Sequence, residues 1–111
     1  MDLSLSQTIA HDLIARNGAI GALKRTSGAR EAMMGIVQFT ALERQGSLIQ
    51  YDDIKFVVSG LDMRNQPPPD PELDTVVFPK NSGNEYKMIS PPNKLSPDGV
   101  TVMFWELACR K

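Results

Sequence analysis

A chain of 111 residues has the usual length of one folded domain and is too short for two hydrophobic cores. Hydrophobic residues make up 41% of it and charged residues 23%, which is the composition of an ordinary globular protein. A formal net charge of -1 excludes strong attraction to a nucleic-acid backbone, and the single cysteine excludes an internal disulfide. The sequence shows no apolar run long enough to cross a bilayer and no signal-peptide start. We therefore expect a protein that stays in the cytoplasm where it is made or leaves it by a route other than secretion.

The first predicted element is a helix over residues 4–17. An S-x-x-Q capping box begins at Ser4, and Asn17-Gly18 is a pair that tolerates the left-handed conformation used where helices end. Four apolar side chains recur between these signals at helical spacing: Leu5, Ile9, Leu13 and Ile14. We assign residues 1–18 to this helix and residues 19–111 to the rest of a single domain.

After the helix, apolar residues alternate with a period of two, which is typical of strands. Turn signals rich in Gly, Pro, Asn and Asp separate the segments. The predicted strands cover residues 19–26, 32–40, 54–59, 75–78, 85–89 and 100–110. In the last strand, Met103, Trp105 and Leu107 share a face with Thr101 and Cys109, and we assign this face to the core. About six short strands with an N-terminal α-helix predict a mainly β protein, a small β-barrel or sandwich.

A proline-rich segment lies between two of these strands. Pro67, Pro68 and Pro69 cannot form the interior of a central strand or a helix, and chain rich in proline is stiff and locally extended. We therefore expect residues 61–73 to project from the barrel as a loop of limited flexibility.

The sequence contains no arrangement that predicts catalysis, so we expect no enzyme activity, no cofactor and no bound metal. His11 is the only histidine, and any Ser-His-Asp or Cys-His site must include it. Its helical neighbours Gln7 and Ala15 would not orient an imidazole base, so we interpret His11 as a solvated residue on the polar side of the helix. Cys109 alternates with core positions and is expected to be a buried thiol with a raised pKa.

Acidic residues cluster near two turns, but without the spacing or the central glycine of a calcium loop. Asp52 and Asp53 precede the strand over 54–59, and Asp70, Glu72 and Asp74 follow the prolines. We expect these residues to have roles in turns and at the surface. Asp53 would close the turn before its strand, and Asp70 would accept hydrogen bonds from local backbone amides.

The order of turn motifs from residue 35 to residue 110 carries a family resemblance. The motifs are Gly35-Ile36-Val37, Gly46-Ser47-Leu48-Ile49-Gln50 before Asp53, Pro71-Glu72-Leu73-Asp74, Gly83-Asn84-Glu85-Tyr86, Ser96-Pro97-Asp98-Gly99 and Trp105-Glu106-Leu107. In this order and spacing they resemble the head-tail connector, or head-closure, proteins in the neck of tailed bacteriophages, of the phage lambda head-tail attachment type. The chain departs from the family pattern at Asp52, at Leu73 and in the inserted Pro67–Pro69.

The resemblance implies a structural virion protein without enzyme activity. Such proteins form a ring of about six or twelve copies between the portal or adaptor protein and the tail terminator or tail tube. The ring closes the DNA-filled head and attaches the tail, and genome DNA passes through its lumen without sequence-specific binding. The near-neutral charge suits this passage, because a strongly basic lumen would retain DNA. The expected location is the virion neck, and the host cytoplasm during assembly, with no membrane contact.

Candidate contact residues follow from this expected role. The 61–73 loop would reach into the channel or onto an adjacent ring, through Leu61, Asp62, Met63, Arg64, Asn65, Gln66, Pro67, Pro68 and Pro69. Ring contacts are expected at the N-terminal helix and the last strand, through His11, Phe104, Glu106, Arg110 and Lys111. A second apolar strand face could supply a lateral surface or could lie inside the barrel: Met33, Val37, Phe39, Val102 and Phe104.

Two other functions remain open. A tail-terminator or tail-tube partner protein would purify with tails and not with filled heads. An oligonucleotide-binding barrel would bind single-stranded DNA in a salt-sensitive way. Lys55 and Lys87 do alternate with Phe56 and Tyr86, as such a barrel requires, but these aromatic residues fall at expected core positions.

Overall fold

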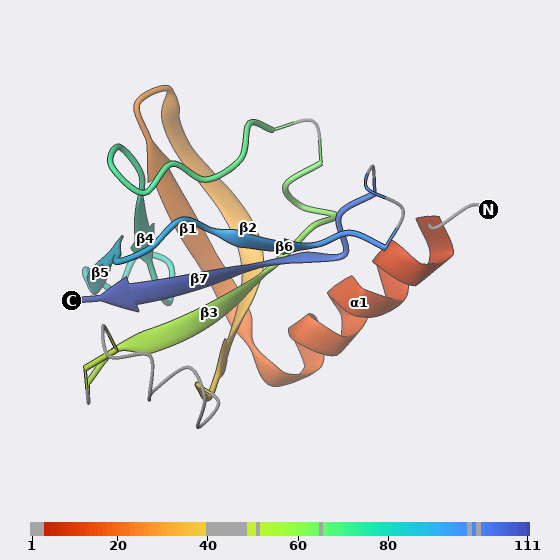
Figure 1. The fold of residues 1–111 in the computed structure, drawn as a ribbon, viewed down its shortest axis with the longest axis horizontal. Coiled ribbons are helices and arrows are strands. Elements are labelled where there is room, and N and C mark those ends of the chain that lie inside the picture. Colours follow the sequence, from red (N-terminus) through yellow and green to blue (C-terminus); the bar gives the residue numbers. More distant parts are fainter. Residues whose placement is uncertain (1–3, 40–48, 51, 65, 98, 100) are drawn as a thin grey trace.

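The computed structural model describes residues 4–39, 49–50, 52–64, 66–97, 99 and 101–111. Within these residues the elements are α1 (Ser4–Asn17), β1 (Ala19–Arg25), β2 (Gly28–Val37), β3 (Ile54–Ser59), β4 (Thr75–Val77), β5 (Glu85–Met88), β6 (Asn93–Leu95) and β7 (Phe104–Arg110). Figure 1 shows α1 beside the sheet, at the end of the molecule opposite the C-terminus. The predicted mainly β fold with one N-terminal helix is confirmed.

The strands of the described chain close into a six-stranded barrel with one extra strand. Neighbours around the barrel follow the order β3-β2-β1-β4-β5-β7, and β7 pairs with β3 to complete the circle. All of these pairings are antiparallel. The extra strand, β6, pairs with Phe104–Glu106 of β7, while β5 pairs with the last residues of the same strand.

Side chains from nearly every barrel strand meet in one core. Its buried members are Leu23, Ala32, Met34, Phe56, Val58, Met63, Val76, Met88, Leu107 and Cys109. Phe56 lies at the centre, with its ring centroid 5.3 Å from that of Phe78 and 5.2 Å from that of Tyr86. The alternation predicted for the last strand is confirmed, because Met103, Leu107 and Cys109 are buried there.

The sequence pattern located most elements but not β6. The predicted bounds of α1 and β3 agree with the structure, and those of β1, β4 and β5 differ from it by one residue. The strands predicted at 32–40 and 100–110 have other bounds: β2 begins at Gly28 and ends at Val37, and the last strand begins only at Phe104. Residues 40, 46–48 and 100 lie outside the described residues. β6 was missed because Asn93, Lys94 and Leu95 are all exposed and therefore show no alternation.

The helix ends at Asn17 as predicted, but the expected left-handed cap is wrong. Neither Asn17 nor Gly18 has a positive φ. Gly18 is required for a different reason, because a Cβ there would overlap the carbonyl oxygen of Met34 on β2. The glycine thus lets the corner between α1 and β1 pack directly on the next strand.

The 61–73 segment does not project along its whole length, which corrects our expectation. Met63 is 4% exposed and belongs to the core, and Pro69 is buried. Arg25 of β1 donates to the carbonyl oxygen of Pro68 at 2.7 Å and forms a buried ion pair with Asp74 at 3.2 Å. These contacts hold the segment against the barrel, since the apolar Met63 side chain and the Arg25 charge both need partners there.

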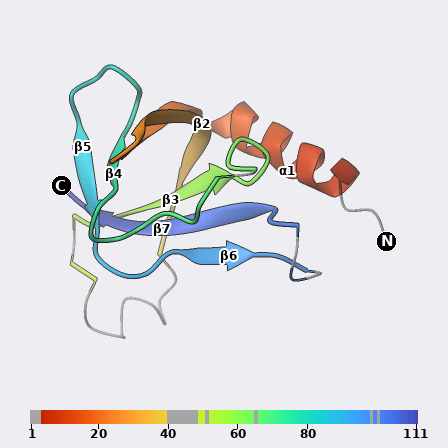
Figure 2. The same ribbon diagram turned by 90° about the horizontal axis from the view of Figure 1, so that it is seen from above.

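Figures 1 and 2 together show the course of this segment. It leaves β3 near α1 and crosses the barrel to the turn before β4, at the far end of the molecule from the helix. Its exposed residues are Arg64, Pro67, Pro68, Glu72 and Leu73. Asp70 accepts hydrogen bonds from the backbone amides of Glu72 and Leu73, so its predicted role in the turn is confirmed.

Candidate functional site

Helix α1 rests on the barrel mainly through polar side chains. Gln7 is 5% exposed and donates from Nε2 to the carbonyl oxygen of Val102 at 2.9 Å. His11 Nδ1 lies 2.7 Å from Ser59 Oγ at the end of β3. Ile14, one turn further on, completes the face that is turned to the barrel.

The opposite face of α1 carries three apolar side chains that are open to solvent. The side chains of Leu5, Ile9 and Leu13 recur every four residues and are 69%, 51% and 53% exposed. We call these three residues the α1 stripe. Asp12 and Arg16, which are also exposed, lie on the same side of the helix. A helix on a globular protein ordinarily turns its apolar side inward, so α1 has the reverse arrangement.

The expectation that His11 is a solvated residue is therefore wrong. Its side chain is 23% exposed, and Nδ1 lies 3.6 Å from Asp62 Oδ2 in addition to its contact with Ser59. The helical period showed that His11 lies opposite the apolar stripe. It could not show which of the two faces meets the barrel.

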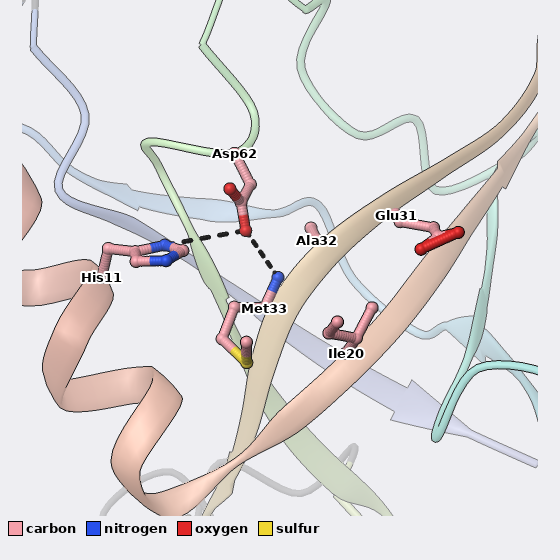
Figure 3. Close-up of a pocket in the computed structure, with 6 residues that line it drawn as sticks. All are labelled: His11, Ile20, Glu31, Ala32, Met33 and Asp62. Carbon is pink, nitrogen blue, oxygen red and sulfur yellow. Dashed lines mark hydrogen bonds and ion pairs between the residues drawn. The ribbon is translucent and has the colours of Figure 1, made fainter.

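A pocket of about 310 Å³ opens beside this histidine, between α1, the first two strands and the turn after β3. It is lined by His11, Ile20, Glu31, Ala32, Met33 and Asp62, as Figure 3 shows. Asp62 is fixed there, because its Oδ2 accepts a hydrogen bond from the backbone amide of Met33 at 2.8 Å. Arg30 also donates to the Asp62 backbone carbonyl at 2.8 and 3.2 Å.

Histidine, serine and aspartate meet at this pocket, but not as a catalytic relay. Such a relay needs the carboxylate and the hydroxyl on different ring nitrogens of the histidine. Here Ser59 Oγ and Asp62 Oδ2 both approach Nδ1 of His11. Ser59 is also 0% exposed, so its hydroxyl cannot reach a substrate. The three side chains instead fasten α1 to the end of β3.

The predicted channel residues differ widely in exposure. Met63 and Pro69 are buried, while Leu61, Asp62 and Gln66 are partly buried. Asn65 lies outside the described residues. The exposed ones are Arg64, Pro67 and Pro68.

Two of the predicted ring-contact residues on β7 make ion pairs within the chain. Glu106 binds Lys55 Nζ at 2.7 Å across the β3–β7 pairing, and Lys55 also lies 6.0 Å from the ring centroid of Phe39. This pair lines a second pocket of about 150 Å³, together with Ser90, Pro91, Asn93 and Ala108. Phe104 is partly buried, and Lys111 Nζ donates to Asn84 Oδ1 at 3.2 Å.

The other intrachain pair joins Arg110 to Asp53. Arg110 Nε lies 2.9 Å from Asp53 Oδ1, and Nη2 lies 3.0 Å from Oδ2, which is a bidentate contact. The hydrogen bond that Arg110 donates to Asp53 raises the pKa of Arg110. Asp53 closes the turn at Gln50 as predicted, but its side chain is 0% exposed, so the expected surface role is wrong. No linear pattern could reveal this pair, because its members lie 57 positions apart.

Cys109 is fully buried in the core, as its position in the strand predicted. Burial raises the pKa of its thiol to about 12, and the negative charge of Asp53 acts in the same direction. This thiol is therefore a small apolar core group and no nucleophile.

Comparison with protein-family models, with curated proteins and with solved structures finds no match to this chain. Among the described residues, no group of three His, Cys, Asp or Glu side chains is placed to hold a metal ion. No helix in the described part of the chain is long and apolar enough to span a membrane.

Proposed function

We propose that this protein is a structural, non-enzymatic subunit of the neck of a tailed bacteriophage. About six or twelve copies would form a ring between the portal or adaptor protein and the tail. The ring would close the DNA-filled head and provide the surface to which the tail attaches. Two things support the proposal: the order of motifs from residue 35 to residue 110, and the exposed α1 stripe.

The α1 stripe is the structural observation that carries the proposal. Fully burying one large aliphatic side chain is worth about 1.5 to 3 kcal/mol, and the folded chain leaves half or more of this gain unused at Leu5, Ile9 and Leu13. The same helix uses Gln7 and His11 for its contact with the barrel. This arrangement is favourable for a subunit whose stripe is covered after assembly, and an exposed apolar patch is typical of a protein-protein contact site.

The charge arrangement also suits a ring through which DNA passes. Cations on or beside the barrel strands are matched with carboxylates in the pairs Lys24–Glu85, Lys55–Glu106 and Lys80–Glu31. Neutralised cations offer little counterion release to a phosphate backbone, so DNA would slide past and would not be retained. The same pairs disfavour an oligonucleotide-binding barrel, as does the packing of Phe56 and Tyr86 against each other in the core.

Separation of heads and tails tests the proposal against its nearest alternative. The protein should be found with filled heads, before any tail is attached. A tail terminator or tail-tube partner would be found with isolated tails. Absence from both fractions and from complete particles would contradict any role in the virion.

A further inference from the structure

We propose that copies of this chain associate head to tail, with the α1 stripe of one copy packed on the exposed side of the 66–73 segment of the next. The receiving surface consists of Pro67, Pro68 and Leu73, and we call it the loop patch. This inference rests on the proposed function and deepens it, because it names the lateral contact of the ring.

The two surfaces lie where a ring requires them. Both views place α1 at one end of the molecule and the turn that leads into β4 at the other (Figures 1 and 2). A contact between two different surfaces of identical subunits is heterologous, and it repeats from copy to copy until the array closes. A symmetric contact between two α1 helices would end at a dimer and leave the loop patch uncovered.

The loop patch is held in place before any partner arrives. Leu73 is 61% exposed, yet its backbone amide donates to Asp70 Oδ1, and the Asp74 amide donates to the Asp70 carbonyl oxygen at 2.9 Å. Pro68 is fixed by the hydrogen bond from Arg25 to its carbonyl oxygen. An exposed leucine on an ordered turn beside stiff prolines would lose little conformational entropy on binding.

Charges beside the two surfaces are complementary. Asp12 and Arg16 accompany the α1 stripe, Glu72 is next to Leu73 of the loop patch, and Arg64 precedes the prolines in the chain. All four side chains are exposed, and none has a side-chain ion pair or hydrogen bond with another described residue. Contact of Leu13 with Leu73 would bring Arg16 of one copy to Glu72 of the next. Charges of both signs on each surface fit a second copy of this chain better than a uniformly anionic or cationic partner.

Disulfide trapping tests the contact directly. The chain has one cysteine, Cys109, and it is fully buried. Any disulfide between copies must therefore join the cysteines introduced at the surface. The variants are Leu13→Cys, Leu73→Cys and the double variant, each oxidised mildly at the highest concentration at which it stays soluble. The double variant should give a ladder of covalent oligomers. A mixture of the two single variants should give a dimer that contains one of each.

Each single variant alone should form no covalent dimer, because a heterologous contact never brings two copies of one position together. A covalent dimer of Leu13→Cys alone would show a symmetric helix contact and overturn the proposal. So would a double variant that forms no covalent oligomer.

Charge exchange provides an independent check. Arg16→Glu and Glu72→Arg should each weaken self-association by about tenfold in sedimentation experiments, and the double variant should regain it. Lys94→Glu, on the exposed strand β6 outside both surfaces, is the matched control and should have no effect. Equal weakening in the double variant and in the single variants would contradict the pairing.

The experiments distinguish a failure of this contact from a failure of the proposed function. A covalent ladder together with normal phage assembly in the absence of the protein would support the contact and reject the neck role. Defective heads together with no ladder would support the neck role and reject this contact.

Discussion

At the scale of single residues, position in the barrel determines whether a side chain is buried and which group it contacts. Cys109 lies on β7 with its thiol in the core, and Arg110 follows it with its guanidinium turned to the buried carboxylate of Asp53. The strand alternation predicted the first placement. The second was not predictable, because the register that brings β7 beside β3 is set by barrel closure.

The raised pKa of Cys109 gives a pH-dependent stability. The thiol keeps its proton in the folded state up to a pKa of about 12, against 9.0 in the unfolded chain. Its contribution is fully present below pH 9.0 and is lost as the pH rises toward 12. Above the unfolded pKa, the free energy of unfolding should fall more steeply than in Cys109→Ala, by up to about 1.4 kcal/mol per pH unit.

Urea denaturation of both proteins across this pH range measures the difference. Other groups titrate there too, but they are common to both proteins and cancel in the comparison. Parallel pH profiles would show that the thiol is not held in its protonated form by the fold.

The pair of Arg110 and Asp53 should matter for stability. Arg110→Ala leaves a fully buried carboxylate without its bidentate partner, and we expect a clearly lower midpoint of denaturation. Lys111→Ala, at the next position, removes an exposed ammonium that contacts Asn84, and it should change the stability by less than about 0.5 kcal/mol. Denaturant titration of both variants is the measurement. Equal stabilities would mean that Asp53 is satisfied without Arg110.

At the scale of elements, one glycine controls how the end of β3 packs. Gly60 donates from its backbone amide to the Met103 carbonyl oxygen at 3.1 Å, and a Cβ on it would overlap the carbonyl oxygen of Val102. Gly60→Ala should therefore cost about 1 to 3 kcal/mol. Gly35→Ala is the control, since its Cβ would lie 3.9 Å from Ile14 Cγ2, an ordinary contact.

Thermal unfolding of the two glycine variants distinguishes them. The melting temperature should fall clearly for Gly60→Ala and stay close to the wild-type value for Gly35→Ala. A similar fall in both variants would contradict the assignment of a special close approach to Gly60.

The elements also show where sequence reasoning reached its limit. The helical spacing of apolar residues and the capping signals predicted the bounds of α1. They could not predict which side of the helix is buried, and Leu5, Ile9 and Leu13 face solvent. Proline chemistry predicted an extended segment after β3. It could not reveal that Met63 enters the core or that Arg25 fastens Pro68, because both contacts depend on strands distant in sequence.

At the scale of the whole molecule, the chain combines a closed barrel with an α1 stripe that is exposed to solvent. Pairing of β3 with β7 closes the barrel, and the described part of the chain needs no partner for its core. The composition and turn order predicted this architecture. The surface that would meet a neighbouring copy became visible only when the structure showed α1 with its polar face inward.

The most direct test is electron microscopy of phage particles assembled with and without this protein, with DNA retention and tail attachment scored in the same images. We predict a ring of matching density beneath the portal when the protein is present, and heads that leak DNA or stay tailless when it is absent. Particles that are filled with DNA and normally tailed in its absence would contradict the proposed neck function.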